Sequence, residues 1–334
     1  MTPRKTPRPA ARPRGPRAPR RPPPAPKPVE GIPFGSTGKL HPPYGIGLWN
    51  LGRWFPADAE RTRGMLLHAL DRGVPWVDTA EVYGAGRSER LLGDVLARWP
   101  KEKTLPFLST KLSWEHLSAA QVRPSLAGSL RRMGVPRVDL YLVHAPNARV
   151  PIAETMGALE QLWKEGLIGA IGVSNFSVEE MEAAQAALRE ARVAVNQVQF
   201  NLLEREDADP ILDYCQKQGI VVEAYSPTAR GLLAGRFLTG RGPPRGDVRS
   251  ERGIFAPERL AATRARVAAL LALAEEAEVP LLSLALHGVA RHGAAPVFGA
   301  SLPDQLDELL AAWEVRPSEA VLDRAERLAR GDGD

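Results

Sequence analysis

Eight short apolar runs, separated by stretches with helical periodicity, limit the folds open to this chain of 334 residues. Their apolar residues do not alternate with polar ones, which predicts strands buried on both faces and therefore a parallel sheet. Eight such units in one chain favour a closed (β/α)8 barrel, the TIM barrel. The alternative is an open doubly wound sheet. It would need a glycine-rich phosphate loop after an early strand, and neither G-x-G-x-x-G nor G-x-x-x-x-G-K occurs.

The predicted strands cover residues 45–49, 76–79, 107–111, 138–144, 168–174, 194–199, 220–225 and 296–299. The helices predicted between and after them cover residues 59–71, 88–99, 119–133, 152–164, 179–190, 209–218, 258–278, 281–290, 303–313 and 319–329. Asp58 and Ser88 are the predicted caps of the first two helices. Residues 31–40 predict an N-terminal β-hairpin, and the last two helices extend beyond the barrel. Residues 227–257 form a long loop, of a length that is usually functional or mobile.

Residues 1–30 differ in composition from the rest of the chain. They hold nine Lys and Arg, one acidic residue and 11 prolines, whereas the remainder has a net charge of −3. We interpret residues 1–30 as a disordered tail and residues 31–334 as a single barrel domain. A basic tail can contact nucleic acid or another anionic surface, but this one has no aromatic residue to stack on bases, so a solvated tail is favoured.

Targeting signals and cysteines say little about function. The tail lacks the apolar segment of a signal peptide, and no apolar run reaches the ~18 residues of a membrane span. Cys215 is the single cysteine, so an intramolecular disulfide is excluded and a structural thiol is expected. The default compartment is therefore the reducing cytoplasm.

Polar residues end several of the predicted strands. Asp78, Lys111 and His144 end the second, third and fourth strands, and Tyr83 lies on the loop after the second. In TIM barrels these strand ends meet at one rim, which carries the active site. Each residue alone also fits a structural role, as a turn residue, a solvated charge or a packing residue. Their convergence on one rim favours a functional site.

These four residue types make a consistent acid–base group. The pKa of a free tyrosine is near ~10, and a lysine ammonium beside it favours the phenolate. An aspartate would hold that lysine, and a neutral histidine can orient a carbonyl. Such a group suits protonation of a carbonyl oxygen as hydride reaches the carbon.

Several short motifs follow one another along the chain: Gly45–Trp49, Asp78–Gly84, Gly86–Glu89, Ser109–Lys111, Asp139–His144, Ile171–Phe176, Asn196–Gln199 and Ala224–Pro227. With these motifs in this order, the chain resembles the aldo-keto reductase family from about residue 32 to residue 312. The resemblance implies an NAD(P)-dependent enzyme that reduces aldehydes or ketones and needs no metal. Tyr83 would be the proton donor, Asp78 and Lys111 would lower its pKa, and His144 would orient the substrate.

The resemblance also implies binding residues. Those implied for the nicotinamide cofactor, NADPH or NADH, are Gly47, Leu48, Ser174, Asn175, Gln197, Tyr225, Ser226, Gly299 and Gln305. Trp49, Trp54 and Trp114 would line the pocket of a small-molecule substrate, although ordinary packing explains tryptophans equally well. The sequence does not name that substrate.

The eighth unit departs from the family pattern. Relatives that prefer NADPH often carry Lys or Arg near Gly299, Ser301 or Gln305, because a 2′-phosphate needs a charged partner. Here these positions are uncharged, Asp304, Asp307 and Glu308 are close by, and Leu309 replaces a common Asn. NADH use, dual use and weak cofactor binding are all open, and Arg230, Arg236 or Arg241 could compensate. A non-catalytic, cofactor-binding regulatory protein on the same fold is the alternative function.

Overall fold

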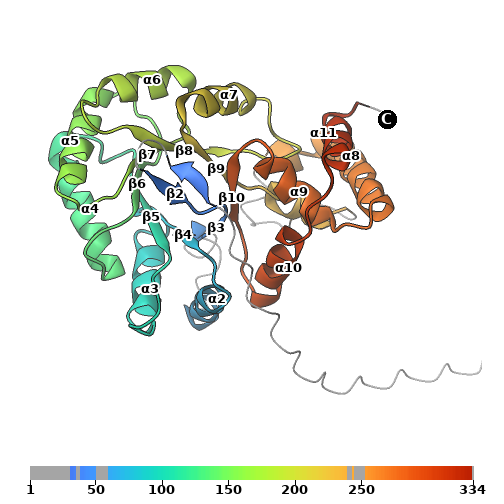
Figure 1. The fold of residues 1–334 in the computed structure, drawn as a ribbon, viewed down its shortest axis with the longest axis horizontal. Coiled ribbons are helices and arrows are strands. Elements are labelled where there is room, and N and C mark those ends of the chain that lie inside the picture. Colours follow the sequence, from blue (N-terminus) through green and yellow to red (C-terminus); the bar gives the residue numbers. More distant parts are fainter. Residues whose placement is uncertain (1–30, 35–37, 50–58, 239–242, 244–252, 333–334) are drawn as a thin grey trace, which may run out of the picture.

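A closed barrel of eight parallel strands forms the centre of the molecule (Figure 1). The structure is a computed structural model and describes residues 31–34, 38–49, 59–238, 243 and 253–332. The strands are β3 (Gly45–Gly47), β4 (Trp76–Asp78), β5 (Phe107–Leu112), β6 (Leu140–Val143), β7 (Ile171–Ser174), β8 (Val193–Gln199), β9 (Val221–Tyr225) and β10 (Ala294–Phe298). β10 pairs with β3 and closes the ring, which confirms the predicted barrel.

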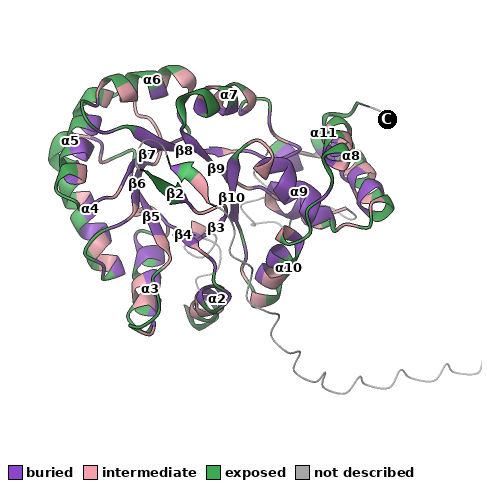
Figure 2. Ribbon diagram, in the orientation of Figure 1, coloured by how far each residue is buried: buried purple, intermediate pink, exposed green. Residues whose placement is uncertain are grey.

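Helices surround the barrel and turn their buried faces toward it (Figure 2). They are α2 (Ala59–Asp71), α3 (Arg87–Leu96), α4 (Ala119–Met133), α5 (Ile152–Lys164), α6 (Val178–Ala186), α7 (Asp209–Gln218), α9 (Leu281–Ala290) and α10 (Pro303–Trp313). Two more, α8 (Pro257–Glu276) and α11 (Glu319–Arg330), pack on each other beside α9, at the right of Figure 1. No described helix is both long and apolar enough to cross a membrane.

The antiparallel hairpin of β1 (Ile32–Phe34) and β2 (Lys39–His41) closes the N-terminal end of the barrel. Phe34 lies in one apolar cluster with residues at the starts of β6 and β9, including Leu140 and Val221. His41 lies among the rings of Phe34, Trp76 and Phe107, with centroids 4.9–5.5 Å apart. The hairpin therefore seals the end of the barrel opposite the candidate site.

Trp76 fills the barrel interior next to the hairpin, and the missing side chain of Gly45 leaves space for its ring. A Cβ atom at Gly45 would lie 2.3 Å from the Trp76 ring, which is closer than any side chain tolerates. The indole nitrogen of Trp76 donates to Ser109 Oγ at 2.8 Å. Ser109 Oγ in turn donates to Asp78 Oδ1, so the Trp76 indole is connected to the polar residues at the C-terminal ends of the strands.

Most helix and strand boundaries agree with the predictions to within a few residues, but one predicted cap is wrong. Helix α3 begins at Arg87 after a left-handed Gly86, and Ser88 lies inside the helix. Ser88 is buried, and its hydroxyl bonds Thr79 Oγ1 at 2.9 Å and Leu48 O at 3.4 Å. The serine therefore ties α3 to the β4 loop instead of capping the helix.

Other predictions near the helices have mixed outcomes. The predicted helix 179–190 is the shorter α6, which starts with a capping box at Ser177. Burial raises the pKa of Cys215 to about 12, and its sulfur lies 3.8 Å from Met181 Sδ, so the structural interpretation is confirmed. Asp58 and the basic tail 1–30 lie outside the described residues.

Candidate active site

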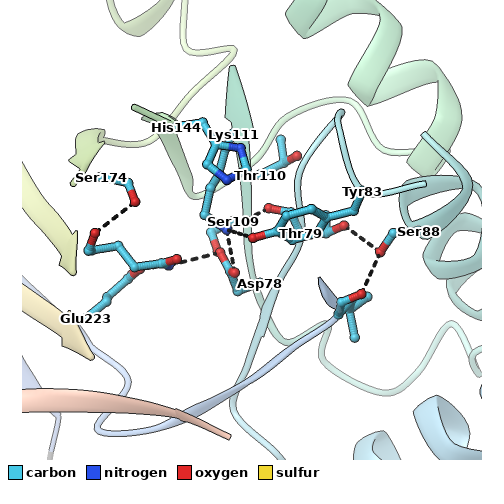
Figure 3. A network of polar contacts seen from close by, with 12 residues as sticks. Asp78, Thr79, Tyr83, Ser88, Ser109, Thr110, Lys111, His144, Ser174 and Glu223 are labelled. Carbon is cyan, nitrogen blue, oxygen red and sulfur yellow. Dashed lines mark hydrogen bonds and ion pairs between the residues drawn. The ribbon is translucent and has the colours of Figure 1, made fainter. Parts of the chain in front are cut away.

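Asp78, Tyr83, Lys111 and His144 come together at the C-terminal rim of the barrel (Figure 3). Asp78 ends β4, Lys111 lies in β5, and His144 directly follows β6. The side chains of Asp78, Tyr83 and His144 line a cavity of about 480 Å³. The parallel register brings the strand ends to one level, because Asp78 pairs with Ser109 and Lys111 pairs with Leu142.

The Lys111 ammonium is the centre of this group. It is fully buried, and its Nζ lies 2.5 Å from Asp78 Oδ2, 3.0 Å from the Thr79 carbonyl oxygen and 3.3 Å from Tyr83 Oη. All three hydrogens of the ammonium thus have an acceptor. This arrangement fixes Nζ against the phenol oxygen.

The second oxygen of Asp78 is also held. Ser109 Oγ donates to Asp78 Oδ1 at 2.9 Å, and Gln197 Nε2 donates to the same atom at 3.3 Å. A buried carboxylate with donors on both oxygens keeps its orientation.

The charges around Tyr83 act against each other. Burial raises the pKa of the Tyr83 phenol to about 12, and Asp78 also raises it, while Lys111 lowers it. We expected Asp78 and Lys111 together to lower this pKa; only Lys111 acts in that direction and burial outweighs it, so the expected net lowering is not found. Burial lowers the pKa of Lys111, yet Asp78 and Tyr83 outweigh burial and raise it above its usual value. The site therefore pairs a protonated phenol with a lysine that stays charged.

His144 is held neutral. Burial, followed by the positive charge of Lys111, lowers the pKa of the His144 imidazole to about 3. Its ring packs edge-on against Tyr83 and Trp114, with centroids 5.4 and 5.5 Å apart. A neutral imidazole beside the phenol can donate one N–H to a carbonyl oxygen.

Residues at the ends of β7, β8 and β9 form a second polar group in the same cavity. Ser174 Oγ donates to the Gln197 carbonyl oxygen at 2.8 Å, and Tyr225 Oη donates to Asn175 Oδ1 at 2.9 Å. Asn175 takes a left-handed backbone with φ of 61°, and its amide nitrogen bonds His144 O at 3.1 Å. All four residues line the cavity. The resemblance implied Ser174, Asn175 and Gln197 for the nicotinamide carboxamide and Tyr225 for its ring.

The loop after β9 has a strained backbone where it borders the cavity. Ser226, Ala229 and Arg230 have φ values of 57°, 47° and 56°, although none is glycine. Non-glycine residues with positive φ concentrate at ligand sites, where a function offsets the cost of the backbone strain. Arg230 is held by the Glu204 carboxylate and by Gln199 Oε1, the latter at 2.6 Å. Ser226 and Arg230 thus line the cavity from a loop whose backbone and guanidinium are both held in place.

The eighth unit contributes Gly299, Ser301, Gln305, Glu308 and Leu309 to the cavity. Gln305 Oε1 accepts from Ser301 N at 3.0 Å. Arg61 and Arg236 also line the cavity, whereas Arg241 lies outside the described residues. The cavity wall therefore carries cations as well as the Glu308 carboxylate.

The predicted substrate residues have different outcomes. Trp49 lines the cavity, and Trp114 lies against His144 at its edge. Trp54 lies outside the described residues. The Leu48 side chain is buried in the core, so only its backbone is near the site, with Leu48 N donating to Asp78 O at 2.9 Å. Trp114 is placed by Glu81, whose carboxylate binds Ser113 N and His116 Nδ1 on the same loop.

Sequence reasoning missed a buried pair beneath the site. Glu223 Oε1 lies 2.9 Å from His41 Nε2, and Glu223 Oε2 accepts from Gln197 Nε2 at 2.6 Å. An acid inside the apolar run Val221–Tyr225 was the available signal. Among the described residues, no cluster of three or more His, Cys, Asp or Glu suits a metal ion.

Comparison with known proteins adds independent evidence. Residues 43–330 match the model of the aldo/keto reductase family. An uncharacterised oxidoreductase of Mycobacterium tuberculosis is 32% identical over 292 residues, covering 86% of this chain and 88% of the relative. The NADH-specific methylglyoxal reductase of Escherichia coli is 27% identical, covering 90% and 99%. An aldo/keto reductase from Klebsiella pneumoniae, solved with NADP and acetate, superposes with a TM-score of 0.71 at 27% identity, covering 90% and 95%.

Proposed function

Because this chain belongs to the aldo/keto reductase family, we propose that it reduces an aldehyde or ketone to an alcohol, or catalyses the reverse reaction, with Tyr83 as the proton donor. The observation that carries the proposal is the position of Lys111 Nζ, 2.5 Å from Asp78 and 3.3 Å from Tyr83 Oη. Lys111 thereby connects its buried ion pair with Asp78 to the Tyr83 phenol, which faces both the cavity and His144.

The proton transfer follows from this geometry. Tyr83 is protonated at neutral pH, so it can donate to a carbonyl oxygen in the cavity. Lys111 stabilises the phenolate that forms, and Asp78 holds the ammonium in place. The neutral His144 donates a second hydrogen bond to the same oxygen and so fixes the carbonyl.

The reducing equivalent would come from NADPH or NADH, which supplies hydride when bound. Ser174, Asn175 and Gln197 would hold its carboxamide, Tyr225 its nicotinamide ring, and the loop from Ser226 its phosphates. Support for both cofactors comes from the relatives: the Klebsiella enzyme was solved with NADP and the Escherichia coli enzyme is NADH-specific. A carboxylate at Glu308 favours a ribose hydroxyl over a 2′-phosphate, so we infer that NADH binds at least as well.

The alternative, a non-catalytic protein that only binds the cofactor, is disfavoured by the intact four-residue group. Two parallel thermal shifts, with NADH and with NADPH, would test cofactor binding, because a ligand of the native state raises its stability.

The activity test is reduction of a carbonyl panel that includes methylglyoxal, followed through NAD(P)H absorbance. Tyr83→Phe should abolish turnover and keep cofactor binding. Tyr141→Phe is the matched control, because the Tyr141 hydroxyl is buried without a partner among the described residues and its loss should leave turnover unchanged. Turnover by Tyr83→Phe at the wild-type rate would reject Tyr83 as the donor.

A further inference from the structure

The polar network of the site does not stop at Asp78 but continues through the barrel to the N-terminal hairpin. Gln197 Nε2 on β8 donates to Asp78 Oδ1 and to Glu223 Oε2, and Glu223 on β9 contacts His41 on β2. Glu223, His41 and Gln197 are all buried. A buried ion pair costs desolvation energy that apolar residues would not, so it calls for a role.

The hydrogen positions in this series of hydrogen bonds follow from the groups that can only accept. The Pro42 carbonyl oxygen can only accept, so His41 Nδ1, 2.6 Å away, carries a hydrogen. One further proton lies between His41 Nε2 and Glu223 Oε1. Whichever atom carries it, the pair is neutral as a whole and Glu223 Oε2 remains an acceptor.

This assignment determines the orientation of the Gln197 amide. Its nitrogen must face Asp78 and Glu223, because an amide oxygen there would meet two acceptors. The amide oxygen is then the polar atom left for the cavity, and no described residue donates to it. Asp78 alone, at 3.3 Å, would hold the nitrogen less firmly than Glu223 does at 2.6 Å.

We propose that Glu223 and His41 are positioning residues for the reaction: they lock the Gln197 amide so that its oxygen accepts from the carboxamide of the nicotinamide cofactor. The charged groups that face the pair are Asp78 on β4 and Lys111 on β5. The other walls around His41 are aromatic rings. The hairpin thereby becomes part of the active-site machinery, and this inference rests on the proposed function.

The pair also faces the acid–base group with its negative end. Glu223 is nearer to Asp78 and Lys111 than His41 is, since it shares Gln197 with Asp78. In either protonation state the Glu223 oxygens face the site, so removing them should make the Tyr83 phenolate easier to form. Alcohol oxidation requires Tyr83 to lose its proton, so its rise with pH should begin at lower pH.

The test compares Glu223→Met, which removes the acceptor of the Gln197 amide, with Glu89→Met. Glu89 is an equally buried carboxylate, paired with Arg132 and Thr110 outside the barrel. Glu223→Met should raise the Kd for NADH about tenfold, the upper value of one net hydrogen bond. It should also move the rise of kcat/KM for alcohol oxidation about half a pH unit lower. Glu89→Met should lower the melting temperature and change neither quantity.

Equal behaviour of the two variants would overturn the proposal. If Glu223→Met does not fold, the double variant His41→Phe/Glu223→Met takes its place, because two apolar side chains can replace a buried pair; a wild-type Kd and pH profile in it would also overturn the proposal. The Kd is measured by protein fluorescence and needs no turnover. An inactive wild-type protein would therefore reject the proposed function while the Kd still tests the role of Glu223.

Discussion

Replacing Lys111 by methionine tests the centre of the site, because it removes the ammonium and keeps the side-chain volume. The Asp78 carboxylate would remain buried with only Ser109 and Gln197 as donors. Breaking a buried pair in this way costs about 3–5 kcal/mol of unfolding free energy. The double variant Asp78→Asn/Lys111→Met should recover most of this loss, because neither charge is then unpaired.

The effect on catalysis can be worked from the distance between Lys111 Nζ and Tyr83 Oη. Two unit charges 3.3 Å apart attract with about 5 kcal/mol at an effective dielectric constant of about 20. Asp78 lies on the other side of the ammonium and cancels part of this, so the value is an upper limit. At 1.36 kcal/mol per tenfold in rate, the loss of kcat is at most about 5,000-fold, and we expect at least about 100-fold.

The assay combines urea unfolding with initial rates in both directions. Lys111→Met and the double variant should both lose at least about 100-fold in kcat, although only the single variant is strongly destabilised. Lys103→Met is the control, because Lys103 forms an exposed pair with Asp71 and contributes little. Wild-type rates in Lys111→Met, or recovery of rate together with stability in the double variant, would refute the electrostatic reasoning.

Three further predictions concern packing, pH and cofactor choice. Gly93→Ala should lose about 1–3 kcal/mol of unfolding free energy, because its Cβ would lie 2.4 Å from the Arg132 carbonyl oxygen where α3 crosses α4. Gly157→Ala on α5, with nothing within 4 Å, should instead gain up to about 1 kcal/mol, and urea unfolding of both variants checks the pair. Burial raises the pKa of Glu326, but His292, Arg205 and Arg291 outweigh it and hold that pKa below its usual value. The lowered pKa stabilises the folded protein above pH ~4.3, and this stabilisation is lost as the pH falls through the folded-state pKa of Glu326. Glu326→Gln should therefore unfold more easily at pH 7, and its stability should depend less on pH between pH 6 and pH 3. Glu308→Arg should improve NADPH binding relative to NADH by at least about tenfold in direct titrations, and an unchanged ratio would show that Glu308 does not contact the adenosine end.

The barrel and the four-residue group could be predicted because both depend on local patterns. Unbroken apolar runs indicate strands buried on both faces, and in a barrel all strand ends meet at one rim. Asp78, Lys111 and His144 at those ends were therefore expected to converge before any distance was known. The helix α5 was predicted to the residue for the same reason, since its apolar spacing is regular and Gly166 follows it.

Other features depend on contacts between distant segments, which a sequence pattern does not contain. Ser88 matches a helix cap by type, but the turn at Gly86 starts α3 one residue earlier and turns the hydroxyl toward Thr79. The pKa of Tyr83 depends on how completely the barrel buries the phenol, and burial outweighs the neighbouring lysine.

The sequence by itself thus determined the order of the strands, the rim where polar groups meet and the chemical types gathered there. Only the tertiary structure decided that Glu223, 182 residues from His41 along the chain, pairs with it beneath the site. The physical reason is that closing the barrel forces strand interiors into one water-free space, where each polar group must find whichever partner lies opposite.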